Sequence, residues 1–558
     1  MPVTLTDLVS YKRLVAAGNN EFWYEDISVA AGDMIELEAA NGTIDTTDQL
    51  TIFEAFQKAF IVNGANLKVA DFVNTKITCS ALTSPPAYGD ILTQDQGDSK
   101  YAYMIVDFVN KAKTAIYGYA YYAGGATAFI TTVDVSSNDA TATMNPNPIP
   151  NANITAVTAK PHWYDWTTYP DIVLSVAKYG QAAGSTKSFG SLPDKAYLGC
   201  RYNSRPILSG NPQEPFQWYM GRQFNPWDFA YIANDAQTPV AGGSGDSVES
   251  NDIVRALIPY KDDFLILGCA TSMYFFMGDP AVGGTKRELD LTTGIFGAKS
   301  WCFDGEGNFY FWGTNGIYAT TIPGTPICIS EQSLPNLVND EAADPSTHRI
   351  IMGYSCKRRG IKVAITKLSD GSHSNYWYDL ATKGFFPESS DSTSHGIYSM
   401  FYYPANAEDY RDLLFGCKDG YIRQEDNSTK NDDGTAIDSY VIVGPIPLGG
   451  GPIAEGKIGP IDITLAGGAA NGTETDSDDV NYKVFVADTA SALIEKLRAN
   501  GAPVFAGTVS GPGRRRGSKQ TQSARGVYGG VRLGTNSATK RWIFECMDIG
   551  QKPTGKRK

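Results

Sequence analysis

Short apolar and aromatic runs separated by tight polar turns dominate the chain, most clearly from Ile253 to Ser330. Phe264–Gly268, Met273–Gly278 and Asn308–Trp312 are such runs, and Gly- and Asp-rich stretches separate them. Asp-Gly and Asn-Gly pairs supply the positive φ angles that two-residue hairpin turns require. The pattern predicts short antiparallel strands in groups of four, which is the building unit of a β-propeller blade.

The same rhythm recurs elsewhere in the chain. Asn315-Gly316-Ile317-Tyr318 has a counterpart in Asp419-Gly420-Tyr421-Ile422, and Ile350–Phe386 repeats the alternation of strand and turn. Such a weak internal repeat is typical of propellers. Thr51–Asp71 is predicted to be a hairpin of the same architecture, with its turn at Asn63–Asn66.

Two segments have a helical pattern instead. Thr4–Ala17 carries Leu5, Leu8 and Val9 at helical spacing, and Gly18 follows as a stop. Ala490–Asn500 has a similar pattern and also ends at a glycine. We therefore expect a short amphipathic helix in each.

The predicted fold class is all-β: a β-propeller with inserted β-sandwich or barrel-like domains and few short helices. An alternative for the first insertion is one blade with an oversized loop, but structureless loops of that length are uncommon in compact domains. The closing strand is expected to pair with the first blade and remove the sheet edges. We expect the chain to be divided into five segments. These are 1–75, an N-terminal helix and first blade; 76–150, an inserted all-β domain; 151–443, the main blades; 444–531, a second β-rich insertion with one short helix; and 532–558, a closing strand and basic tail.

Charge and cysteine usage narrow the function classes. The 47 Lys and Arg and 60 Asp and Glu give a net charge of -13, which disfavours tight general binding of nucleic acid. The 8 cysteines are scattered without a C-x-x-C pair, so buried free thiols are expected rather than a disulfide framework or a zinc site. The N-terminus lacks the pattern of a signal peptide, and no apolar run is long enough to span a bilayer. We expect a protein made in the cytosol that stays soluble or assembles there.

Candidate catalytic and metal-binding residues form no strong pattern. The 4 histidines follow no metal-ligand spacing, and no nucleophile elbow, phosphate-binding loop or dinucleotide fingerprint is present. The carboxylate pairs Asp26/Asp71 and Glu21/Glu25 have nothing in the sequence that places them in a pocket. Asp304–Asn308 partly matches a calcium loop but lacks its closing Glu, so a plain turn is favoured. We expect no catalysis, no metal and no cofactor.

Two other features have alternative interpretations. The aromatic cluster His162–Trp166 suits a blade core better than a sugar-binding platform. Two basic loops contain Lys357, Arg358 and Arg359, and Arg514, Arg515 and Arg516. Solvated turns are the default interpretation of these loops, and the alternative is that they face DNA or a protein partner.

Four parts of the chain together resemble the tail nozzle, or tail hub, proteins of short-tailed bacteriophages, also called tail tubular protein B or DNA-stabilisation proteins. The resemblance extends over most of Asn153–Arg423 and the last strand, and does not include 76–150 or 444–531. The parts are Asn203–Pro212 with Trp218-Tyr219 and Pro226–Phe229; Ile253–Leu267; Asp304–Tyr318; and Lys540–Glu545.

This resemblance implies a structural virion protein without enzymatic activity. In that family a β-propeller with inserted β-domains forms a ring of six copies below the portal and adaptor, and genomic DNA is held in the lumen and leaves through it. The implied partners are further copies of the chain, the adaptor and portal-side proteins, tail fibres or spikes, and DNA in transient non-specific contact. The implied location is the virion tail, assembled in the host cytoplasm without membrane insertion. A propeller glycoside hydrolase or lyase and a carbohydrate-binding propeller remain open alternatives.

Overall fold

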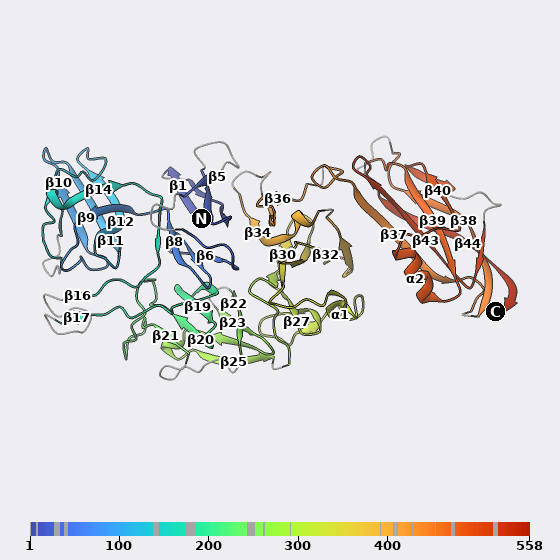
Figure 1. Ribbon diagram of the computed structural model, residues 1–558, viewed down its shortest axis with the longest axis horizontal. Coiled ribbons are helices and arrows are strands. Elements are labelled where there is room, and N and C mark those ends of the chain that lie inside the picture. Colours follow the sequence, from blue (N-terminus) through green and yellow to red (C-terminus); the bar gives the residue numbers. More distant parts are fainter. Residues whose placement is uncertain are drawn as a thin grey trace. The chain divides into compact units, whose positions relative to one another are not determined.

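The computed structural model divides into two compact units (Figure 1). The N-terminal unit comprises Met1–Phe386 and Ile397–Gln424, and the C-terminal unit comprises Pro387–Gly396 and Glu425–Lys558. In the part of the chain that the structure describes, no helix is long and apolar enough to cross a membrane. The described residues are 2–6, 9–26, 34–37, 43–137, 144–173, 185–242, 252–260, 263–290, 292–390, 392–405, 408, 411–426, 429–451, 453–469, 475–516 and 523–557.

The N-terminal unit consists mainly of successive antiparallel meanders, in which each strand pairs with the one before it, except that β15 (His162–Asp165) of the first sheet pairs with β8 (Leu67–Asp71). Five of these sheets have four strands and the sixth has three. The first contains β6 (Thr51–Ala55), β7 (Lys58–Val62), β8 (Leu67–Asp71) and β15 (His162–Asp165); the second β18 (Leu198–Tyr202), β19 (Arg205–Asn211), β20 (Glu214–Met220) and β21 (Val240–Ala241); the third β22 (Val254–Tyr260), β23 (Phe264–Cys269), β24 (Met273–Met277) and β25 (Thr285–Asp290). The fourth contains β26 (Trp301–Phe303), β27 (Phe309–Gly313), β28 (Gly316–Thr320) and β29 (Ile327–Cys328); the fifth β30 (His348–Ser355), β31 (Gly360–Lys367), β32 (His373–Asp379) and β33 (Phe385–Glu388); the sixth β34 (Ile397–Tyr403), β35 (Asp412–Cys417) and β36 (Ile422–Gln424).

Consecutive sheets share apolar cores. Ile258 of the third sheet packs in one cluster with Phe311 of the fourth, and Ala364 of the fifth packs with Leu413 of the sixth. Blade strands bury both faces in this way because each sheet is covered by a neighbour on either side. This arrangement confirms the expected all-β, propeller-like class.

The N-terminal sheet of β3 (Val15–Gly18), β4 (Glu21–Glu25) and β5 (Met34–Glu36) lies between the sixth sheet and the first. The Tyr403 hydroxyl of β34 donates to the Glu25 carboxylate. Phe22 of β4 stacks on Trp163 of β15, with ring centroids 5.1 Å apart. The N-terminal sheet therefore connects the sixth sheet back to the first, which closes the circle of sheet contacts.

The predicted helix over Thr4–Ala17 is wrong. β1 (Pro2–Thr6) and β2 (Val9–Lys12) form an antiparallel hairpin there, and β3 follows. Val3, Thr4 and Thr6 are β-branched and favour extended backbone, and pairing between the strands outweighs the helical spacing of the leucines. Asp7 and Leu8 lie outside the described residues.

The predicted hairpin over Thr51–Asp71 is confirmed at its turn but wrong in its first arm. The Asn63 and Asn66 backbones close the turn between β7 and β8. The first arm is two strands, β6 and β7, because Phe56 and Gln57 adopt φ of 52° and 59° and reverse the chain. Neither is a usual turn residue, so the sequence carries no signal for this reversal.

A six-stranded sheet occupies the segment between β8 and β15, in the order β13-β10-β11-β12-β9-β14. It packs against the first blade, where Tyr117 of β12 lies 4.3 Å from Tyr164 between ring centroids. The short pair β16 (Ile172–Val173) and β17 (Thr186–Lys187) follows β15. The sheet's strands are β9 (Thr75–Cys79), β10 (Ile91–Asp95), β11 (Tyr101–Val109), β12 (Ala115–Ala123), β13 (Ser136–Ser137) and β14 (Ile154–Thr158).

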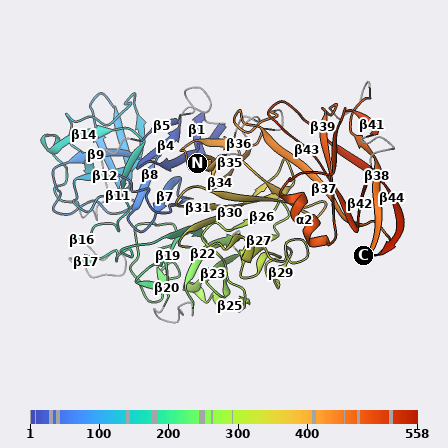
Figure 2. The same ribbon diagram turned by 45° about the vertical axis from the view of Figure 1, so that its right-hand side comes forward.

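The C-terminal unit is a β-sandwich. Ile461 and Ile463 of one sheet pack against Tyr482 and Val484 of the other. The short helix α2 (Ala490–Arg498), which the sequence predicts, buries Leu493 and Leu497 against Phe485 on the other face of the second sheet. One sheet is β38 (Ala454–Leu465), β41 (Gly513–Arg516), β42 (Ala524–Gly526) and β44 (Phe544–Arg557), and the other is β37 (Ile437–Pro447), β43 (Tyr528–Ser537), β39 (Val480–Ala487) and β40 (Phe505–Val509). These strands stay grouped near the C-terminus in both views (Figures 1 and 2).

Two expectations about the C-terminal segments are therefore wrong. β44 pairs with β38 of the sandwich and not with the first blade, because Met547 and Ile549 pack on the sandwich core. The expected boundary at 443/444 falls inside β37. Most of the expected basic tail belongs to β44, and Lys558 lies outside the described residues.

Candidate functional site

The first predicted basic loop is the turn between β30 and β31. Lys357 forms an ion pair with Asp412 at 2.9 Å, and the Arg358 guanidinium lies over the Trp377 ring at 3.8 Å from its centroid. Arg359 is exposed and adopts a φ of 53°. The structure thus gives Lys357 and Arg358 local partners on neighbouring strands.

The second predicted basic loop is part of a strand. Arg514, Arg515 and Arg516 belong to β41, which pairs with β38. Arg514 contacts Asp462 at 3.3 Å and Asp548 at 3.1 Å, so its charge is locally balanced. Gly517–Lys519 of the predicted loop lie outside the described residues.

A basic row that the sequence interpretation missed crosses the same sheet. Lys457 of β38 is directly opposite Arg525 of β42 on one side and Lys552 of β44 on the other. All three residues are exposed, and Arg525 pairs with Glu455 at 2.6 Å. Residues in register on adjacent strands share one face, so three cations gather on the open side of the sandwich. Only the strand register brings them together, and the sequence alone does not give that register.

Charge is distributed unevenly between the two parts of the chain. Residues 425–558 contain 17 Lys and Arg against 15 Asp and Glu, whereas residues 1–424 contain 30 against 45. The acidity of the protein is therefore a property of its N-terminal part. The C-terminal part is close to neutral, with the basic row on one face.

The carboxylates of Asp26, Asp71, Glu21 and Glu25, considered above as pairs, each interact with other residues of the protein. Glu25 accepts hydrogen bonds from Tyr403 and from the Leu14 backbone, and Glu21 accepts one from the Trp23 indole. Asp71 is buried, and Asp26 contributes negative charge beside Arg13. Each acid thus has a structural partner, and Glu21 also lines a small pocket of about 10 Å³.

Asp71 belongs to a buried polar network between the first blade and the inserted sheet. Lys58 of β7 contacts Asp107 of β11 at 2.7 Å, and the Asn74 amide donates to Asp71 at 2.7 Å and to Asp107 at 2.6 Å. Tyr164 donates to Asp71 at 2.8 Å. Burial alone would raise the pKa of Asp107, but Lys58 and the hydrogen bonds outweigh it and hold that pKa below its usual value. The network joins the first blade to the sheet that is inserted between its strands β8 and β15.

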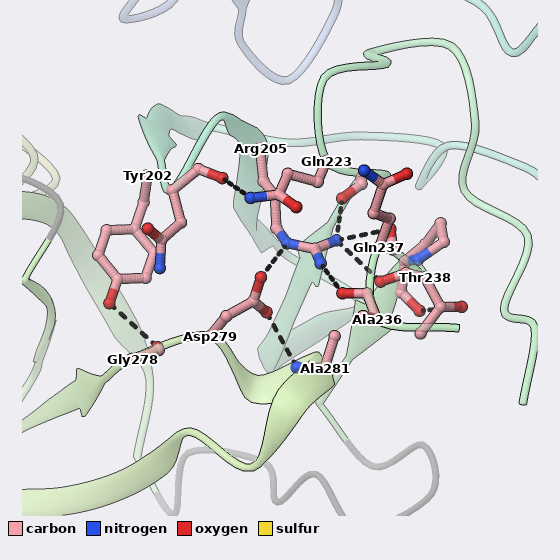
Figure 3. Close-up of polar contacts among 12 residues, drawn as sticks. Tyr202, Arg205, Gln223, Ala236, Gln237, Thr238, Gly278, Asp279 and Ala281 are labelled. Carbon is pink, nitrogen blue, oxygen red and sulfur yellow. Dashed lines mark hydrogen bonds and ion pairs between the residues drawn. The ribbon is translucent and has the colours of Figure 1, made fainter. Parts of the chain in front are cut away.

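Arg205 is the centre of a second buried network, shown in Figure 3. Its side chain is wholly buried, and its Nε contacts Asp279 at 2.9 Å. Its Nη1 donates to the carbonyls of Gly221, Gln237 and Thr238 at 3.0, 3.1 and 2.8 Å, and its Nη2 donates to that of Ala236 at 3.2 Å. Asp279 in turn accepts from the Ala281 backbone at 2.9 Å. One guanidinium thus joins the second sheet, the loop 221–238 and the third sheet.

A cavity of about 300 Å³ opens beside this loop. Its walls include Lys187 and Arg222, the carboxylates of Asp228 and Asp235, and the Phe224 ring. Burial raises the pKa of Asp228. The sequence interpretation did not identify this cavity, because its walls come from three separate segments.

The remaining candidates are structural. Asp304 accepts from the Glu306 and Asn308 backbones at 2.9 and 2.8 Å, as a turn residue does. Trp163 and Trp166 are buried, which confirms the core interpretation. Among the residues that the structure describes, no group of His, Cys, Asp or Glu could hold a metal ion. All eight cysteines are free thiols, although Cys356 and Cys546 are exposed rather than buried.

Comparisons with known proteins do not define a family. No family model and no curated sequence matches the chain. Among solved structures, Hsv2 of Kluyveromyces lactis is 10% identical over 68% of this chain and 94% of its own, with a TM-score of 0.25. A Bacteroides thetaiotaomicron protein of unknown function is 9% identical over 68% and 87%, with a TM-score of 0.25. An exo-β-1,3-galactanase of Phanerochaete chrysosporium is 8% identical over 86% and 100%, with a TM-score of 0.20. Scores this low carry no argument about function.

Proposed function

We propose that the chain is a structural virion protein of a short-tailed bacteriophage. In this proposal it forms an oligomeric tail nozzle or hub ring, six copies around a lumen, below the portal and adaptor. The ring retains genomic DNA and releases it during ejection, and it has no enzymatic activity. The protein assembles in the host cytoplasm, and it contacts the adaptor and the tail fibres or spikes.

The observation that carries this proposal is the role of the residues on which the resemblance rests. Arg205 is wholly buried and joins two sheets. Trp227 is also buried, and its indole donates to Asp107 at 3.1 Å across to the inserted sheet. These buried residues join separate sheets into one scaffold, which suits a protein whose function is its shape.

The charge distribution supports a conduit for DNA. An acidic wall does not grip phosphates, so DNA slides past it, whereas cations hold DNA in proportion to the phosphates they neutralise. The N-terminal part supplies the acidity. The basic row of Lys457, Arg525 and Lys552 offers a limited number of contacts, consistent with transient non-specific binding.

A ring of identical subunits needs a heterologous interface that closes on itself. β36 is the last strand of its three-stranded sheet. Tyr421 beside it is 68% exposed and Ile422 is 41% exposed. Exposed apolar side chains at a sheet edge favour contact with a partner.

The test is the mass and shape of the purified protein, alone and with portal and adaptor proteins, by light scattering and negative-stain electron microscopy. We expect closed rings of identical copies, either alone or on the adaptor. A chain that stays monomeric under both conditions and hydrolyses an oligosaccharide would exclude the nozzle and favour the carbohydrate-active alternative.

A further inference from the structure

The cavity beside the loop 221–238 has an unusual combination of charged and aromatic walls. Tyr88 comes from the inserted segment, Lys187 from β17, and Arg222 and Phe224 from the loop. Its volume of about 300 Å³ is at the lower end of the range for small-molecule sites. The cavity lies within the N-terminal unit, so it exists in a single copy of the chain.

The carboxylates of the cavity are fixed by the backbone. Asp228 accepts from the Ala230 N–H at 2.9 Å, and Asp235 accepts from the Gln237 N–H at 2.9 Å. Each also faces a cation: Asp235 contacts Arg222 at 2.6 Å, and Asp228 lies 3.7 Å from Lys187. A carboxylate has about four acceptor positions and a guanidinium has five donors, so both kinds of group can hydrogen-bond a ligand without breaking these pairs.

Phe224 is an exposed aromatic residue in a strained conformation. Its side chain is 57% exposed and its φ is 61°, which is unfavourable for a bulky residue. Its N–H donates to the Ser204 carbonyl at 2.9 Å, and its carbonyl accepts from the Tyr88 hydroxyl at 3.3 Å. The Asn225 N–H donates to the Arg222 carbonyl at 3.1 Å, so a tight turn holds Phe224 in this conformation. The turn leaves the aromatic side chain exposed, where a ligand can stack on it.

Arg205 fixes both ends of the loop that lines the cavity. Its guanidinium binds the carbonyls of Gly221 and Gln237. In the sequence, these residues flank the segment that carries Arg222, Phe224 and Asp235. A loop fixed before binding loses little conformational freedom when the ligand arrives.

We propose that this cavity is a saccharide-binding site for one or two sugar units. Sugar hydroxyls both donate and accept, so they can pair with the Arg222 guanidinium and the Asp235 carboxylate, whose side chains are 21% and 25% exposed, whereas Asp228 is almost wholly buried beside Lys187. The apolar C–H face of a sugar ring can stack on Phe224. A phosphate would meet two carboxylates, and a zwitterionic amino acid would have to displace the existing ion pairs. This inference goes beyond the proposed ring and does not depend on it.

The test is a titration of the full chain with glucose, galactose, N-acetylglucosamine, rhamnose and their disaccharides, by ligand-observed NMR and calorimetry. We expect a dissociation constant in the range of about 0.1–10 mM for at least one of them. Phe224→Ala should weaken binding about fivefold to tenfold through the lost stacking contact. Asp235→Asn should weaken it further, because a neutral amide is a poorer acceptor of hydroxyl protons.

Phe401→Ala is the matched control, because Phe401 is 59% exposed on β34 and does not line the cavity. Circular dichroism checks that each variant is folded. The proposal is overturned if no sugar binds at about 10 mM, if Phe224→Ala and Phe401→Ala bind equally well, or if inorganic phosphate or glycine binds in place of the sugars. These outcomes are independent of ring formation, so the two proposals can fail separately.

Discussion

Replacing Arg205 with Met should strongly destabilise the N-terminal unit. The change keeps much of the side-chain bulk but removes the cation from Asp279 and the donors from the four backbone carbonyls of the loop 221–238. Breaking a buried ion pair by removing one partner costs about 3–5 kcal/mol. Each orphaned carbonyl adds to this cost unless water reaches it. We therefore expect a loss of at least about 3 kcal/mol.

Native-state hydrogen exchange measures this loss segment by segment, which suits a chain of more than one unit. Protection of β19, β20 and β22 should fall by a factor of about one hundred or more, since 1.4 kcal/mol corresponds to tenfold. The C-terminal sandwich should be unchanged and serves as an internal control. Arg514→Met removes an arginine that is 64% exposed and should cost less than about 1 kcal/mol.

The reasoning is refuted if Arg205→Met costs no more than Arg514→Met. Asp279→Asn provides a second check, because it leaves Arg205 buried with only carbonyl partners. Arg205→Met and Asp279→Asn should not be additive, since both remove the same interaction. Additive losses would mean that the two side chains stabilise the fold separately.

Lys58→Met should cost about 3–5 kcal/mol in urea unfolding, because it leaves Asp107 without its cation, and Lys58→Met with Asp107→Leu should recover much of that loss. The pKa of Asp107 lies below its ordinary value of 3.8 in the folded protein. The pair therefore stabilises the fold above about pH 4 and loses this contribution as the pH falls through the folded pKa. If the pH midpoint of acid unfolding is the same in the double variant as in the unchanged protein, this reasoning is contradicted. Residues 425–558 expressed alone should fold, and circular dichroism should show one cooperative unfolding transition, since the sandwich has its own core. Aggregation of this fragment would refute the prediction. The double variant Lys457→Glu with Lys552→Glu should bind heparin with a shallower dependence of log K on log salt concentration, by about two ion contacts. An unchanged slope would exclude the basic row as a binding surface for polyanions.

The blades could be predicted from the sequence because each is a local structure. Apart from β8 and β15, their strands pair with the next strand in the chain, and the turn between β27 and β28, at Thr314-Asn315, lies beside an Asn-Gly pair that is visible in the sequence. The N-terminal hairpin could not be predicted in this way. Leu5, Leu8 and Val9 fit a helix as well as two strands, and only pairing with neighbouring strands decides between them.

The candidate site was predictable only in part, for the same physical reason. The basic residues Arg514 and Arg515 were visible as a run, but Asp548, the ion partner of Arg514, lies on another strand. Lys457 and Arg525 are isolated in the sequence and Lys552 begins the basic tail, so the three come together only through strand register. Such contacts cannot be read from the sequence, because strands that are far apart in the chain can be neighbours in a sheet.

The position of β44 changes how the propeller is closed. A propeller closed by its own C-terminal strand depends on the last residues of the chain, so any C-terminal domain would have to be inserted before them. Here the N-terminal sheet completes the circle through Glu25 and Phe22, and the chain leaves the propeller after β36. The sandwich can therefore follow as a separate unit with its own core, and β44 completes that unit. Substitutions at Phe22 should consequently destabilise the propeller and leave the sandwich intact, whereas substitutions at Ile549 should do the reverse.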